Sequence, residues 1–321
     1  MCDTIVMDRG LSMRHKFMSL NLPLFVNPIA NTLGLTKYQL STDSTAHKLV
    51  LDHIMKNYVF KCAVALMDVT LEAEAFKVGL KSDGVNLPKI VSYLDPNKVI
   101  LPTSYPHRTR SYLETIEAIE DYKVIATITG PFTLTSLILG FTKTKELLKG
   151  NKTQLIRVVE IVYRYLTNYV NDLIKAGICG LFICEPIAGF LTSSECDRFS
   201  TKYINKIIDK SSKSIFTIYH NCAKTSPITN SLAKLKVDAY HFGEATNLEN
   251  IINKLPESKM VMGNLSPLDD FLYSDDKHVK IATLRLLDRM KNYDNFQISF
   301  GCELPYETKI NNIETYINLT K

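Results

Sequence analysis

The sequence predicts a single (β/α)8 barrel, and three observations favour this fold. Eight short runs rich in apolar and β-branched residues recur along the chain, and helical stretches follow most of them. No domain-sized linker or second core interrupts the series, so we expect one domain over residues 1–321. The rival fold, an open doubly wound sheet, is disfavoured because no G-x-G-x-x-G follows the first run.

The predicted strands are short and end in, or directly before, a polar residue, glycine or proline. In chain order they are Leu24–Asn27, Val64–Val69, Val124–Thr129, Gly180–Glu185, Ile215–His220, Val237–Phe242, Met260–Asn264 and Phe296–Gly301. The segments between them are predicted helices, for example Lys152–Ala176 and Ser194–Lys210, because apolar residues recur there at helical spacing.

The second and third runs are unusually far apart. The spacing leaves room for an insertion around residues 70–123, which we expect to lie over the barrel mouth. Within it, Leu87–Thr103 contains three prolines and is predicted to be a loop.

Composition excludes several classes of protein. With 45% hydrophobic and 22% charged residues, the chain is neither disordered nor collagen-like. Its 38 Lys and Arg against 33 Asp and Glu give a net charge of only +5 without a basic block, which argues against nucleic-acid binding. No apolar run reaches membrane-spanning length. Seven scattered cysteines and a start, Met1–Gly10, without an apolar signal region lead us to expect a cytoplasmic protein with reduced thiols.

Chemically active residues gather where the predicted strands end. In a (β/α)8 barrel the loops after the strands build the active site, so the set is typical of an enzyme, although any one of these residues can be polar simply because loops are solvated. The set comprises Asn27, Asp68, Gly130-Pro131, Glu185-Pro186, His220 with Cys222, His241 with Glu244, Asn264, and Cys302-Glu303.

Three of these residues suggest a metal site. His220 and Cys222 lie two apart at the end of the fifth run, so their side chains point to the same side. Alone, the pair is more typical of a buried Cys beside a hydrogen-bonded His. Cys302 follows the eighth run, and barrel closure would bring it to the same mouth. One imidazole and two thiolates leave a fourth position open, which is the pattern of a catalytic zinc.

Four segments in order resemble a known family. G-P-F-T-L-T-S-L at Gly130–Leu137, Y-H-N-C at Tyr219–Cys222, G-N-L-S-P at Gly263–Pro267 and G-C-E-L-P-Y-E-T at Gly301–Thr308 are similar to the uroporphyrinogen decarboxylase superfamily. Within it, they resemble most the zinc-dependent corrinoid methyltransferases typified by methylcobamide:coenzyme M methyltransferases. That resemblance implies a (β/α)8 barrel and zinc ligands at His220, Cys222 and Cys302.

Departures from the true decarboxylases separate the branches. Their R-Q-A-G-R-Y-type arginine segment, which grips the substrate carboxylates, has no counterpart, since Arg9 and Arg14 stand in M-D-R-G-L-S-M-R. Leu137 replaces their Tyr, and Gly301-Cys302-Glu303 replaces their G-H-G. Asp68 instead favours the decarboxylases, because it falls where they keep an Asp that binds pyrrole N–H groups.

The resemblance implies a zinc-dependent transfer of a methyl group between a corrinoid and a thiol or similar acceptor. A small-molecule thiol would be activated on the zinc, and the methylcobamide would be carried by a partner corrinoid protein, because no corrinoid-binding module is recognised in this chain. Two alternatives stay open. One is a metal-free lyase that decarboxylates a tetrapyrrole through Asp68, and the other is a non-catalytic barrel that binds a corrinoid or tetrapyrrole.

Further side chains are candidates for the same site. Glu185 is either the fourth zinc ligand or a substrate contact in a catalytic role, or else a structural residue beside Pro186. Asp68 is the second catalytic candidate. His241 is a partner of the ligands or, slightly favoured, an ordinary barrel histidine. The predicted substrate-binding residues are Asn27, Asp68, Glu72, Glu74 and Asn264.

Overall fold

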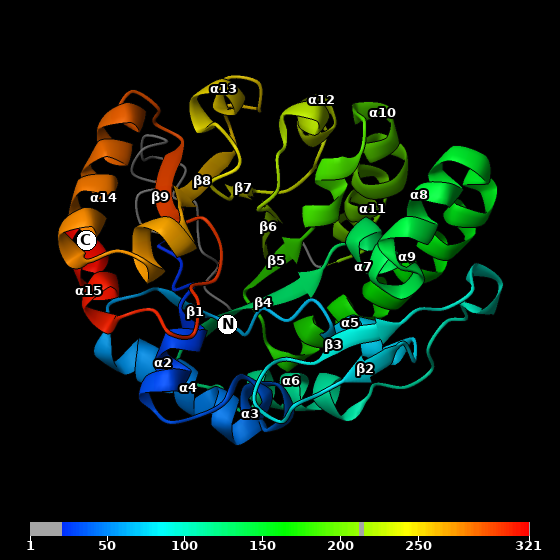
Figure 1. Cartoon of the computed structure of the whole chain (residues 1–321), viewed down its shortest axis with the longest axis horizontal. Helices are drawn as coiled ribbons and strands as arrows, with labels where there is room; N and C mark the ends of the chain where they lie inside the picture. Colours follow the sequence, from blue (N-terminus) through cyan, green and yellow to red (C-terminus); the bar gives the residue numbers. More distant parts are fainter. Residues whose placement is uncertain (1–20, 212–214, 321) are drawn as a thin grey trace.

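A curled, fully parallel sheet forms the centre of the protein (Figure 1). The computed structural model describes residues 21–211 and 215–320. The order of the strands in the sheet follows their order in the chain: β1 (Cys62–Val64), β4 (Lys123–Thr129), β5 (Gly180–Cys184), β6 (Phe216–Asn221), β7 (Ala239–Phe242), β8 (Met260–Leu265) and β9 (Phe296–Phe300). Seven of the eight predicted runs therefore overlap a strand, although the run Val64–Val69 shares only Val64 with β1.

Helices surround the sheet on its outer side (Figure 1). The longest is α9, which spans Lys152–Ala176 as predicted. The Asn151 side chain accepts a hydrogen bond from the Gln154 amide at its start, and Gly177 ends it in the left-handed conformation. The predicted helix Ser194–Lys210 is formed by α10 (Ser193–Cys196), a π-helical turn at Asp197–Thr201, and α11 (Lys202–Lys210).

The other α-helices of the described residues precede the first strand, connect successive strands or, in the case of α15, follow the last strand. They are α2 (Val26–Thr32), α3 (Lys37–Thr42), α4 (Ser44–Asn57), α5 (Leu71–Ala75), α6 (His107–Glu117), α7 (Pro131–Leu139), α8 (Phe141–Gly150), α12 (Thr229–Leu232), α13 (Leu248–Ile252), α14 (Asp276–Met290) and α15 (Ile310–Thr320).

The prediction of a closed eight-stranded barrel is wrong in one element. The run Leu24–Asn27 forms no strand, because it passes from irregular chain into helix α2 at Val26. Proline explains the difference: Pro23 cannot donate a hydrogen bond to a sheet, and Pro28 is tolerated in the first turn of a helix.

The irregular segment nevertheless fills the place between the two edge strands. The Leu24 carbonyl accepts a hydrogen bond from the Leu304 amide, 2.9 Å away, just beyond β9. The Phe25 ring contacts Phe300 on β9 and Phe60 ahead of β1, with ring centroids 5.9 and 5.7 Å apart. Apolar packing therefore links β9 to β1 where a strand was expected.

The region between β1 and β4 is more ordered than predicted. It contains α5, an antiparallel pair of strands β2 (Gly79–Lys81) and β3 (Lys89–Ser92), a 3-10 turn at Pro96–Lys98, and α6. The expected loop Leu87–Thr103 thus includes a strand. That this insertion covers the barrel mouth stays a prediction.

Across residues 21–211 and 215–320, each helix is too short or too polar to cross a lipid bilayer.

Candidate metal centre

The curvature of the sheet brings together three side chains from distant parts of the sequence. His220 lies on β6, Cys222 follows the end of β6, and Cys302 lies two residues beyond β9. Their ligand atoms all lie within 4.8 Å of one another, and Cys302 Sγ is 3.5 Å from His220 Nε2. Gly243, directly after β7, leaves room for the Cys222 backbone, because a Cβ there would lie 2.7 Å from the Cys222 Cα.

The donor set fits a zinc ion. With Zn–S near 2.3 Å and Zn–N near 2.05 Å, a tetrahedral site places sulfur and nitrogen ligands about 3.6 Å apart. The Cys302–His220 separation of 3.5 Å matches this value. Two sulfurs and one imidazole are also the ligand types that zinc prefers over harder cations.

The contact between the two thiols shifts their pKa values in opposite directions. The hydrogen bond from Cys302 is the main cause that lowers the pKa of Cys222 to about 4, and His220 adds to the effect. The same bond, together with burial, raises the pKa of Cys302 well above its ordinary value. A divalent metal would therefore meet one thiolate already formed and would displace one proton from the pair.

The second nitrogen of His220 has a partner of its own. Its Nδ1 lies 2.8 Å from Nδ1 of His241 on β7, and His241 Nε2 lies 3.2 Å from the Ser299 hydroxyl on β9. Burial lowers the pKa of His241 well below its ordinary value, so this ring is neutral. Of the two roles considered for His241, the structure favours that of a partner to the candidate ligand.

The Glu185 carboxylate forms hydrogen bonds with other parts of the protein. Its carboxylate accepts hydrogen bonds from the Phe132 and Thr133 amides at the start of α7 and from the Ser200 hydroxyl, at 2.9, 2.8 and 2.7 Å. Gly130 makes room for it, because a Cβ there would clash with the carboxylate. Burial raises its pKa. This geometry favours the structural alternative, in which Glu185 caps a helix, over a zinc ligand.

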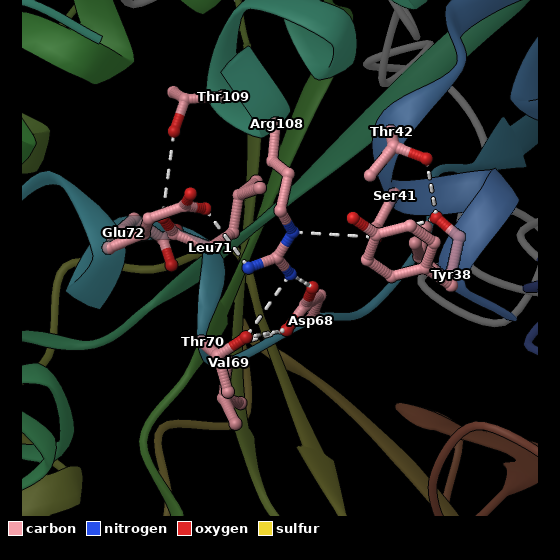
Figure 2. A network of polar contacts seen from close by, with 12 residues as sticks. Tyr38, Ser41, Thr42, Asp68, Val69, Thr70, Leu71, Glu72, Arg108 and Thr109 are labelled. Atoms are coloured by element: carbon pink, nitrogen blue, oxygen red, sulfur yellow. Dashed lines mark hydrogen bonds and ion pairs between the residues drawn. The ribbon is translucent and has the colours of Figure 1, made fainter. Parts of the chain in front are cut away.

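Asp68 is paired with a buried arginine that sequence reasoning missed (Figure 2). Arg108 reaches from α6 to the Asp68 carboxylate, and its other nitrogens contact Glu74 at 3.1 Å and the Ser41 hydroxyl at 3.4 Å. Thr70 donates to the second Asp68 oxygen through its amide and its hydroxyl, at 2.9 and 2.7 Å. Two of the predicted substrate contacts thus hold α6: Asp68 from the loop after β1 and Glu74 from α5.

A signal for Arg108 exists in the sequence. Arg108, Tyr112 and Ile116 recur at four-residue spacing on the buried face of α6. An arginine on the apolar stripe of a helix needs a carboxylate partner, because an unpaired buried charge is costly.

Glu72 is the second buried carboxylate near the strand ends. It accepts hydrogen bonds from the Thr129 amide and hydroxyl, at 2.9 and 2.7 Å. Burial is the main cause that raises its pKa to about 7, so the protonated form is well populated near neutral pH. Glu72 therefore ties α5 to the end of β4.

The two predicted asparagines differ in their contacts. Asn264 is engaged by the fold, because its amide donates to the Gly243 and Thr246 carbonyls at 3.1 and 2.6 Å. Asn27 donates its backbone N–H to Glu303, 3.1 Å away, and its side-chain oxygen is buried without a partner. Glu303, beside Cys302, is a further carboxyl that sequence reasoning left without a role, and burial raises its pKa to about 8.

Arg9 and Arg14, which do not match the arginine segment of the decarboxylases, lie outside the described residues. Within those residues, Arg108 is the one arginine that is buried, and its charge is taken up by Asp68 and Glu74.

Fold and site together define an α/β barrel-like protein with thiol and imidazole groups at the carboxyl ends of its strands. Residues 40–321 match the sequence profile of the family described as uroporphyrinogen decarboxylase (URO-D). The chain belongs to this family, as the four sequence segments indicated.

A known relative agrees with this assignment, and two solved structures are similar in fold. The uroporphyrinogen decarboxylase of Thermoplasma acidophilum is 25% identical over 200 residues, which cover 57% of this chain and 58% of the relative. A methyltransferase from Methanosarcina mazei has the same fold, with a TM-score of 0.81, 14% identity and coverage of 95% of this chain and 92% of that one. A B12-independent methionine synthase from Shewanella sp. W3-18-1 is also similar in fold, with a TM-score of 0.56, 11% identity and coverage of 86% and 87%.

Proposed function

We propose that this chain is a zinc-dependent methyltransferase, which moves a methyl group between a corrinoid on a partner protein and a thiol or similar acceptor. The observation that carries the proposal is the cluster of His220, Cys222 and Cys302. Its separations fit a tetrahedral zinc, and its three ligands leave one position for a substrate. The fold shared with a methyltransferase supports the reaction class.

When bound, the zinc would lower the pKa of an incoming substrate thiol so that the thiol reacts as its anion at neutral pH. The chain's own groups set the charge of the site. Cys222 and Cys302 supply two negative charges as thiolates, which balance a divalent cation, and a neutral His220 adds none. An incoming sulfur would therefore keep most of its negative charge and its nucleophilicity.

The corrinoid and its carrier protein rest on the family resemblance. In this proposal the methyl group is supplied on cobalt by a separate protein that docks at the carboxyl ends of the strands. The carrier would have to bring the methyl carbon into line with the sulfur, because group transfer depends on such alignment.

A decarboxylase acting through Asp68 is the second candidate, and the family's name and relatives favour it. The Arg108 ion pair weakens it, because both oxygens of Asp68 already have partners in the protein. The third candidate is a barrel that binds a corrinoid or tetrapyrrole without catalysis. Both alternatives predict a chain without zinc.

Metal analysis of purified variants tests the proposal. The wild type should hold about one zinc per chain, and Cys222→Ala and Cys302→Ala should lose it, because each removes a ligand and a negative charge. Folding should persist, since a core of this size does not depend on one metal. Cys196→Ala, a buried cysteine on α10, is the matched control and should keep its zinc. Full zinc content in a Cys222/Cys302 double variant would end the proposal.

A further inference from the structure

We infer that His241 is a positioning residue of the proposed zinc site, which holds His220 in the tautomer whose Nε2 is free to bind the metal. The inference rests on the proposed function and adds a residue to it. His241 acts through His220, because the three candidate ligand atoms belong to other side chains.

Four groups form one continuous line of contacts from the candidate ligands into the sheet. Cys302 Sγ lies 3.5 Å from His220 Nε2, the two Nδ1 atoms lie 2.8 Å apart, and His241 Nε2 lies 3.2 Å from Ser299 Oγ. His220, His241 and Ser299 are 1%, 0% and 0% exposed, so water does not compete for these contacts. Phe182 packs against both rings and fixes their orientation.

The direction of the hydrogen bonds follows from the role of His220. A neutral imidazole carries one proton, and a nitrogen that binds a metal cannot carry it. If Nε2 is the ligand, the proton is on Nδ1 and is donated to Nδ1 of His241. His241 then carries its own proton on Nε2, where the Ser299 hydroxyl accepts it. The opposite direction would place an N–H of His220 at the metal position.

The chemical nature of the partner also matters. Histidine ligands of metals commonly donate to a carboxylate or a carbonyl oxygen, which fixes the tautomer and raises the basicity of the ligand. Here a neutral imidazole takes that place, so the tautomer is fixed without adding a third negative charge. The balance between two thiolates and a divalent cation is thereby preserved.

Zinc affinity, measured by competition with a chelator, tests the inference. His241→Phe keeps a ring but removes the acceptor, and zinc should bind about 10- to 100-fold more weakly. His241→Asn, whose Oδ1 can stand near the Nδ1 position, should recover most of the affinity. His47→Phe makes the same change at a buried histidine on α4 and should bind zinc as the wild type does.

Each result has a distinct meaning. Wild-type affinity in His241→Phe would overturn the inference and leave the proposed function standing. An equal loss in His47→Phe would also overturn it, because the effect would then be general destabilisation. A wild-type chain that binds no zinc would end the proposed function, and the inference with it.

A measurement on the wild type covers the case in which His241→Phe does not fold. In the zinc-loaded chain labelled with 15N-histidine, NMR should show His220 protonated on Nδ1 and His241 protonated on Nε2. His241→Asn assigns the signals. A proton on Nε2 of His220 would overturn the inference.

Discussion

Single buried carboxyl groups around the strand ends hold the barrel-like fold together. Glu185 caps α7, Glu72 joins α5 to β4, and Asp68 joins the loop after β1 to α6 through Arg108. Each would be costly to bury without these partners. From the sequence, their positions after the strands suggested catalytic or substrate-binding roles. In the structure, their carboxylate oxygens form hydrogen bonds or ion pairs within the protein.

Glu72 should make stability depend on pH. Its folded-state pKa of about 7 exceeds its ordinary value of 4.5, so the folded chain binds more protons between these values. Its favourable contribution is complete below pH 4.5 and is lost as the pH rises to about 7. The stability of Glu72→Gln relative to wild type should therefore rise by up to ~3 kcal/mol between pH 4.5 and 7.5. Urea unfolding measures the difference, and parallel pH profiles for the two proteins would contradict it.

The buried Arg108–Asp68 pair should contribute more to the free energy of unfolding than an exposed ion pair does. Arg108→Met leaves Asp68 buried without its counter-charge and should lower the free energy of unfolding by about 3–5 kcal/mol. Arg289→Met, which breaks an exposed pair with Glu249, is the control and should cost about 0–1 kcal/mol. If the two variants unfold at the same urea concentration, Asp68 is not held by Arg108 and regains its place as a substrate contact.

At the scale of elements, local sequence patterns predict helices well, but they do not predict which distant side chains pair with each other. The helix Lys152–Ala176 has the bounds that the sequence predicts, because the spacing of its apolar residues is a local signal. Arg108 and Asp68 are 40 residues apart, and the His220–His241 contact joins separate strands. Sequence order alone does not show which of several polar groups will face each other.

The irregular segment at residues 22–25 lies where the sequence predicted a strand. Its contribution to stability can be tested. Phe25 is fully buried between β9 and the chain ahead of β1, so Phe25→Ala should cost about 3–5 kcal/mol of stability. Phe190→Ala, at a site that is 71% exposed, should cost less than about 0.5 kcal/mol. Calorimetry of both variants checks this. Equal melting temperatures would mean that residues 22–25 do not hold the edges together.

At the scale of the whole molecule, the curl of the sheet creates the candidate metal centre. β6 and β9 are separated by β7 and β8, and only a strongly curved sheet can place His220 and Cys302 in contact. The sequence allowed this to be predicted, because the carboxyl ends of parallel strands meet at one rim. The seven-stranded sheet with its irregular closing segment brings these two side chains together without an eighth strand.

Methyl transfer from methylcobalamin to a panel of thiols, with zinc-loaded and zinc-stripped protein, tests the central claim most directly. We predict methylated thiol from the zinc-loaded chain, loss of activity on stripping, and recovery when about one zinc per chain is restored. Methylation at the same rate by stripped protein or by the Cys222/Cys302 double variant would contradict the account. So would a zinc-free chain that forms coproporphyrinogen.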